Sequence, residues 1–148
     1  MMTDYMDMFV LMMLAHFTGD YILQSQWMAT EKSHKGWRGH KACTIHVLAY
    51  TLAFVLVAGI YNPWALLAIA LPHWLIDRWS LASYLLSFKN GYTLHDVWQK
   101  APLCAAPDPD KLASNVWKVA FAAPVYIVND NTIHWLCLLL TARYFYGG

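Results

Sequence analysis

Three pairs of histidine and aspartate recur at a spacing of four residues within the apolar parts of this sequence. The pairs are His16 with Asp20, His73 with Asp77, and Asp130 with His134. Residues four apart share one face of an α-helix, so each pair would present an imidazole and a carboxylate from a single stripe. His46 adds a fourth imidazole, and Gln24 extends the first stripe by one more turn.

Imidazole and carboxylate side chains together are a common ligand set for divalent metals, Zn²⁺ first, with Mn or Fe as alternatives. The predicted ligands are His16, Asp20, His46, His73, Asp77, Asp130 and His134. They exceed the four ligands of one tetrahedral zinc ion. The excess indicates two metal ions, or one ion with outer carboxylates that orient its histidines. Asp20, Asp77 and Asp130 would be ligands, or one of them would act as a general base.

Four long apolar segments must position these groups, at residues 5–28, 43–61, 63–88 and 119–146. Each approaches the ~20 residues that span a bilayer. Hydrophobic residues make up 59% of the 148 residues and charged residues only 13%, against about 25% in a typical soluble domain. Eight Trp and nine Tyr fit interfacial aromatic belts. The sequence therefore predicts an all-α, integral membrane four-helix bundle that forms one transmembrane domain over residues 1–148.

The charged residues between the segments predict the orientation of this bundle. Residues 30–41 carry Lys32, Lys35, Arg38 and Lys41 beside the single acid Glu31. The positive-inside rule places this loop in the cytoplasm of a bacterial inner membrane. The turn at residues 61–63 and both termini then lie outside, and residues 89–118 return to the cytoplasm, where their last part is predicted to form a short interfacial helix. Every segment thereby brings its polar groups to the cytoplasmic half.

Several other features narrow the class of protein. The acidic N-terminus lacks the basic region of a secretory signal peptide, so the first apolar run is predicted to be a retained helix. A net charge of +1 gives no basic surface for nucleic acid. The three cysteines are far apart and form neither a disulfide framework nor a zinc knuckle. The expected partners are membrane lipids and further copies of the chain.

Three polar or basic side chains near the predicted ligands could bind a substrate. They are Gln24, Lys32 and Arg78. Lys32 lies in the basic loop, and Arg78 follows Asp77 directly, about 100° away around the helix. Both could neutralise a phosphate at the mouth of the site. The alternatives are that the basic loop serves only as a topology signal and that Arg78 extends to the lipid headgroups.

An ordered set of these motifs resembles a family of small bacterial and phage membrane proteins of unknown function. The set is His16-Phe-Thr-Gly-Asp20, Leu23-Gln24, Lys32, His46, His73-Trp-Leu-Ile-Asp77-Arg78 and Asp130 with His134. Asn131 stands where this resemblance leads one to expect Gln. The HxxxD motifs are more distantly similar to those of membrane-embedded metal-dependent hydrolases, and this likeness is an analogy of motif alone.

Three functions fit these observations. The first is metal-dependent hydrolysis of a lipid, or of another substrate that bears a phosphate or an ester, near the cytoplasmic face. The second is a proton or metal-ion transporter or channel, which four helices would form only as an oligomer. The third is a phage-type factor that binds a host membrane protein, with the cluster as a structural polar core. Clustered ionisable groups within a membrane favour function over structure, because each costs roughly 2.5–3.5 kcal/mol to insert.

Overall fold

The computed structural model describes residues 4–91 and 109–147. Among these residues there is no β-strand, and nearly all are helical, which confirms the predicted all-α class. The chain falls into two compact units. The first comprises residues 1–79 together with 134–148, and the second comprises residues 80–133.

The helices follow the apolar segments, with several differences in their bounds. They are α1 (Tyr5–Phe17), the π-helix η1 (Thr18–Ile22), α2 (Gln26–Glu31), α3 (Trp37–Val57), α4 (Pro63–Trp79), α5 (Leu81–Asn90) and α7 (Pro109–Tyr146). The final segment, expected from residue 119, is part of a 38-residue helix that runs through Pro124. The last part of the predicted connection, residues 109–118, belongs to this helix, and residues 92–108 of that connection lie outside the described residues.

Two of the four predicted segments are interrupted. Residues 5–28 are not one helix, because α1 widens into a π-helix at Thr18, whose hydroxyl donates to the carbonyl of Leu14 at 2.9 Å. Such single-turn π-helices are frequent at functional sites. Residues 63–88 are divided at Ser80, whose backbone is left-handed (φ 50°) and separates α4 from α5. A left-handed residue cannot continue a right-handed helix, so the chain changes direction there.

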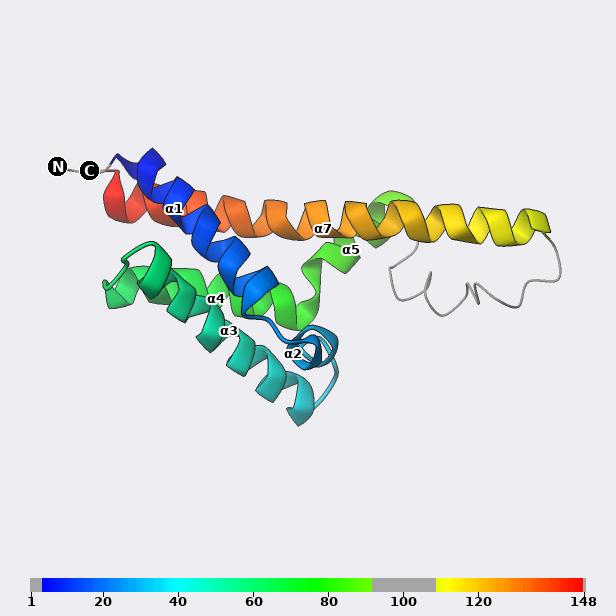
Figure 1. The fold of residues 1–148 in the computed structure, drawn as a ribbon, viewed down its shortest axis with the longest axis horizontal. Coiled ribbons are helices and arrows are strands. Elements are labelled where there is room, and N and C mark those ends of the chain that lie inside the picture. Colours follow the sequence, from blue (N-terminus) through cyan, green and yellow to red (C-terminus); the bar gives the residue numbers. More distant parts are fainter. Residues whose placement is uncertain (1–3, 92–108, 148) are drawn as a thin grey trace. The chain divides into compact units, whose positions relative to one another are not determined.

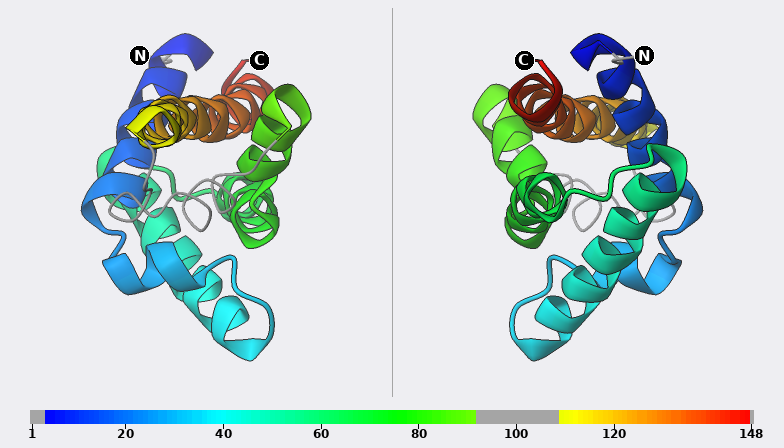
Figure 2. Two further views of the ribbon diagram at one scale, coloured as in Figure 1. Left: turned by 90° about the vertical axis from the view of Figure 1, so that its right-hand side faces the viewer. Right: turned by 90° about the vertical axis from the view of Figure 1, so that its left-hand side faces the viewer.

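In the first unit, α1 and α4 both pack against α3 (Figures 1 and 2). Asn62 starts α4, since its side-chain oxygen accepts from the backbone N–H of Trp64 at 2.9 Å. The turn between α3 and α4, the start of α1 and the end of α7 lie at one end of the unit (Figure 1). The loop between α2 and α3, which holds the basic residues, lies at the other end.

The interior of the first unit has two layers. Near the turn between α3 and α4 it is apolar, with a core of Met8, Met12, Ala15, Tyr50, Phe54, Ala58, Ile60, Ala65, Ile69, Leu138 and Ala142. Toward the basic loop it holds the polar side chains of α1, η1, α3 and α4. The second unit has a smaller core, in which Leu86 and Ala122 pack with Val125 and Tyr126.

The outward faces of the helices are strongly apolar. On α3 alone, Leu48, Leu52 and Leu56 are exposed by 67%, 51% and 72%. Similar residues cover the outside of α1 and α4, among them Val10, Leu14, Leu67 and Leu71. Within the described part of the chain, one helix is both long and apolar enough to cross a membrane, the 21-residue α3. The membrane span of the other predicted segments remains a prediction.

Candidate metal centre

Four histidines gather in the polar layer of the first unit, each from a different helix. His16, His46, His73 and His134 are exposed by 0%, 0%, 1% and 2%. Two carboxylates lie among them, Asp77 on α4 and Asp20 on η1. Burial on this scale removes the water that would otherwise solvate these groups, so they depend on one another for polar contacts.

The centre of the cluster is formed by two imidazole nitrogens that face each other. The Nε2 atoms of His46 and His73 lie 3.0 Å apart. The Oδ1 atom of Asp20 lies 3.2 Å from the first and 3.4 Å from the second. The Oδ2 atom of Asp77 lies 3.1 Å and 3.3 Å from the same two nitrogens. Each of the two carboxylate oxygens thus lies close to both nitrogens, and these five separations are between 3.0 and 3.4 Å.

These separations are compatible with a metal site as well as with hydrogen bonds. A neutral imidazole has one N–H, so each ring can donate to only one of the acceptors around it. Among the described residues, Asp20 Oδ1 is buried and makes no hydrogen bond despite the two nearby rings. In a tetrahedral zinc site with bonds of ~2.0–2.1 Å, ligand atoms lie roughly 3.3–3.4 Å apart. His46, His73 and Asp77 could thus hold a metal ion, and so could His16, Asp20 and His73.

Two of the three predicted substrate-binding residues lie at this centre. Lys32, at the C-terminal end of α2, places its Nζ 2.8 Å from Asp77 Oδ2. Its side chain is 15% exposed, against 2% for Asp77, so it lies on the open side of the cluster. The side-chain amide nitrogen of Gln24 lies 3.2 Å from His46 Nε2 and 3.3 Å from Nδ1. Because Gln24 follows the π-helix, it reaches His46 from non-helical backbone.

Arg78 lies elsewhere, on the outer side of α4. Its guanidinium donates to the carbonyl oxygen of Ser33 and to a ring nitrogen of His40, each at 3.4 Å. These contacts hold the basic loop against α4, so they support the segment that carries Lys32. The remaining predicted ligand, Asp130, lies on α7 in the second unit, four residues before His134.

Tyr50 is a member of the cluster that the spacing of histidines and aspartates does not reveal. Its ring stacks on that of His73, with centroids 3.6 Å apart and planes at 18°. Its hydroxyl lies 3.0 Å from Nδ1 of His16. It lies one turn from both His46 and Phe54 on α3, and so joins the polar layer to the apolar core. That position, four residues after His46, was the signal available in the sequence.

Gly19 allows η1 to approach Tyr50 closely. A Cβ atom at this position would lie 2.5 Å from Tyr50 Cδ2 and 3.1 Å from its Cα. Such contacts are shorter than van der Waals packing permits, and the second involves backbone that cannot rotate away. Glycine between His16 and Asp20 is therefore what brings η1 against α3 and sets Asp20 beside His46.

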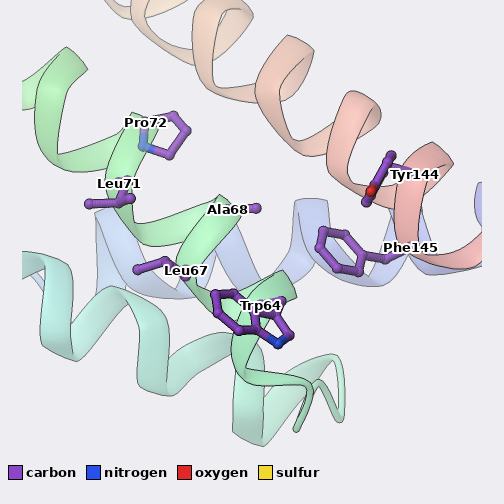
Figure 3. A pocket seen from close by; sticks show the side chains of 7 residues that line it. All are labelled: Trp64, Leu67, Ala68, Leu71, Pro72, Tyr144 and Phe145. Atoms are coloured by element: carbon purple, nitrogen blue, oxygen red, sulfur yellow. The ribbon is translucent and has the colours of Figure 1, made fainter.

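An apolar groove of about 620 Å³ lies apart from these groups, along α4 and the end of α7 (Figure 3). It is lined by Trp64, Leu67, Ala68, Leu71, Pro72, Tyr144 and Phe145. Its only polar side-chain groups are the indole N–H and the phenol. It has no acid, base or metal ligand, so the chemistry of this unit belongs to the buried cluster.

Fold and site together define an all-helical protein with a buried histidine and aspartate cluster that could bind a metal ion. The chain belongs to the family described as "Protein of unknown function (DUF3307)", which matches residues 8–146. This agrees with the resemblance to a family of unknown function that the motifs indicated. Neither the curated proteins nor the solved structures contain a match to the chain.

Proposed function

We propose that this chain is a membrane-embedded, metal-dependent hydrolase that acts near the cytoplasmic face. The observation that carries the proposal is the pair of buried imidazole nitrogens, 3.0 Å apart, with one carboxylate oxygen of Asp20 and one of Asp77 within 3.1–3.4 Å of both. His46, His73, Asp20 and Asp77 would bind the ion. This nitrogen and oxygen set suits Zn²⁺, with Mn or Fe as alternatives.

Gln24 would orient one of these ligands. A histidine that binds a metal through Nε2 carries its proton on Nδ1 and donates it to an outer group. The Gln24 side chain lies 3.3 Å from Nδ1 of His46, and its amide can turn so that the carbonyl oxygen accepts this proton. Outer partners of this kind are worth roughly 10–100-fold in metal affinity.

The proposal of a membrane location is supported by the distribution of polarity in the first unit. Its interior holds four histidines and two aspartates, while leucines and other large apolar residues cover its outer faces. Lipid would cover such an exterior at no cost, whereas exposed apolar patches of this extent are rare in water-soluble monomers. The basic loop near Lys32 would then face the cytoplasm, with the turn between α3 and α4 on the opposite side.

The reaction would be hydrolysis of a phosphate or carboxylic ester. A bound divalent ion lowers the pKa of water and makes it a nucleophile at neutral pH. Water would lose one proton to solvent, and its oxygen would form the new bond to phosphorus or carbon while the bond to the leaving oxygen breaks. The Lys32 ammonium, on the open side of the cluster, would give a proton to the leaving oxygen and recover one from solvent.

Lys32 also favours hydrolysis over cation transport. A positive charge 2.8 Å from a ligand oxygen would repel a metal ion that must enter and leave repeatedly. The same charge would attract an anionic phosphate and stabilise the negative charge that develops on it. The position of Lys32 therefore favours a permanently bound metal ion with an anionic substrate over a cation that is transported.

The test is elemental analysis of the purified protein beside a His73→Ala/Asp77→Ala variant, followed by assays with phospholipids and water-soluble phosphate esters. His34→Ala is a matched control, because this histidine is exposed in the basic loop. We expect bound metal and hydrolysis in the wild type and the control, and loss of both in the double variant. Metal-driven ion flux in liposomes without hydrolysis would instead identify a transporter. Absence of metal from an active wild type would exclude this proposal.

A further inference from the structure

Each of the two carboxylates presents its two oxygens to different histidines. Asp20 directs Oδ1 toward His46 and His73, while its Oδ2 lies 3.4 Å from Nδ1 of His16. Asp77 directs Oδ2 toward His46 and His73, while its Oδ1 lies 4.0 Å from Nε2 of His134. The metal ion proposed above, bound by His46 and His73, would use only one oxygen from each aspartate.

The other two histidines form a second pair. The rings of His16 and His134 have centroids 5.3 Å apart and planes inclined by 32°. They lie beside His73, whose ring centroid is 4.3 Å from that of His134 and 6.5 Å from that of His16. Both are fully buried, where an imidazole without a charged or polar partner would lose the solvation of its ring nitrogens. His16 faces Oδ2 of Asp20 and His134 faces Oδ1 of Asp77, the two carboxylate oxygens that the first site would not use.

We propose that the cluster binds two divalent metal ions, the second held by His16 and His134 and bridged to the first by Asp20 and Asp77. The inference rests on the proposed metal centre and extends it. Each ion would have two imidazoles and one oxygen from each bridging carboxylate. Paired ions in hydrolytic enzymes lie ~3.5–4 Å apart, a spacing that bridging carboxylates maintain.

Tyr50 contacts one of the proposed ligands of the second ion, His16. Its hydroxyl lies 3.0 Å from His16 Nδ1, the nitrogen that also faces Asp20. In the metal-free protein the hydroxyl and this nitrogen share one hydrogen bond, whose donor depends on the tautomer of His16. His16 Nδ1 would help to hold an ion at the second site, and the phenol would then donate its proton to another acceptor.

A pair of ions beside the Lys32 ammonium favours a phosphate ester as the substrate. Two ions can stabilise the attacking and leaving oxygens of an in-line displacement at phosphorus together. The water oxygen forms the new bond to phosphorus, the bond to the ester oxygen breaks, and the water's proton leaves to solvent. Lys32, 2.8 Å from a bridging carboxylate, protonates the leaving oxygen. Phospholipids and free phosphate monoesters share this chemistry, and assays on both distinguish the source.

The experiment uses the full chain in detergent, stripped of metal and loaded with Mn²⁺. Elemental analysis counts the ions, and electron paramagnetic resonance reports whether they are coupled. We expect two ions per chain with an exchange-coupled signal. His16→Gln and His134→Gln should each keep one ion with the spectrum of an isolated Mn²⁺, and phosphate ester hydrolysis should fall at least 100-fold. Circular dichroism confirms that each variant keeps its helices.

The outcomes separate this inference from the proposed function. One uncoupled ion in the wild type overturns the second site and leaves the first intact. Two ions in both His16→Gln and His134→Gln overturn the ligand assignment. A wild type that binds no ion overturns both proposals. The wild-type spectrum decides the question even where a variant fails to fold.

Discussion

The Nε2 atoms of His46 and His73, from helices α3 and α4, face each other at 3.0 Å, with one oxygen of Asp20 and one of Asp77 close to both. Two carboxylates are buried there, and the Lys32 ammonium, 2.8 Å from the Asp77 oxygen, offsets the charge of one of them. A cation at this point would balance the two carboxylates. The stability of the first unit should therefore depend on metal.

Removal of metal should destabilise the protein. A ligand present at 100 times its dissociation constant stabilises the folded state by about 2.7 kcal/mol. We expect chelation to lower the midpoint of thermal unfolding by several degrees, and added Zn²⁺ or Mn²⁺ to restore it. The measurement is thermal unfolding in detergent, followed by circular dichroism. A midpoint that is the same with chelator and with metal would show that no ion contributes to the fold.

Lys32→Met should separate catalysis from metal binding. The metal-loaded variant should keep its ion while kcat for ester hydrolysis falls ~100-fold or more, because the leaving oxygen loses its proton donor. The metal-free variant should be less stable than the wild type, since Asp77 loses the ammonium at 2.8 Å. Lys35→Met, at an exposed position of the same loop, is the control. Equal loss of activity in both variants would argue against a specific role of Lys32.

Tyr50→Phe should remove the hydrogen bond to His16 and keep the stacking of the ring on His73. The ring would still stack on His73, so the first metal ion should remain bound. Loss of the hydroxyl removes the contact with His16 Nδ1 and should cost about 1 kcal/mol of unfolding free energy in the metal-free protein. Chemical denaturation with and without metal measures this difference. A large loss of bound metal in Tyr50→Phe would mean that the hydroxyl itself is needed at the site.

Gly19→Ala should lower both the stability of the protein and its metal affinity, because it prevents η1 from packing closely against α3. The new Cβ would lie 2.5 Å from Tyr50 Cδ2, and overpacking of this kind costs about 1–3 kcal/mol. Metal affinity should fall as well, because Asp20 follows Gly19 directly. Thr18→Ala is the adjacent control, since it removes only a hydroxyl bond on the outside of the helix and should change stability by ~0.5 kcal/mol or less. If Gly19→Ala matches Thr18→Ala in stability and metal affinity, the close approach of η1 to α3 is not needed.

Leu52→Lys tests the membrane location. Leu52 is exposed on α3, at the middle of the predicted apolar segment 43–61, where a lysine in lipid would cost about 2.5–3.5 kcal/mol. We expect less of the protein to resist alkaline extraction from membranes, while Leu52→Phe behaves as the wild type does. In a water-soluble protein the same lysine would be harmless at an exposed position. Undiminished resistance of Leu52→Lys to extraction would therefore count against a lipid-facing α3.

The residues of the site were predictable from the sequence because they follow the period of a helix. His16, Asp20, His46, His73 and Asp77 all lie in the polar layer, as their spacing within apolar segments led us to expect. Their helical setting was equally predictable, since long apolar runs without alternation favour helices. The membrane span, the metal and the reaction remain predictions, to be decided by the experiments above.

The ends and interruptions of the helices were less predictable. A left-handed backbone at Ser80 divides one apolar run, and a π-helix at Thr18 divides another, although neither interruption falls at a proline. An apolar run of residues predicts which part of the chain is removed from water. It does not report where hydrogen bonding changes from one helical pattern to another.

The sequence by itself determined which residues could bind a metal and which helix each one occupies, because those properties depend on local spacing. The tertiary structure decided which atoms meet. It brings Lys32 to Asp77 and directs Arg78 to the basic loop, although both are cations close to the motifs. It also stacks Tyr50 on His73, and it brings η1 against Tyr50 through the space left by Gly19. These relationships depend on how helices far apart in the chain pack together, and that packing is set by side-chain shape across the whole interior rather than by any local pattern.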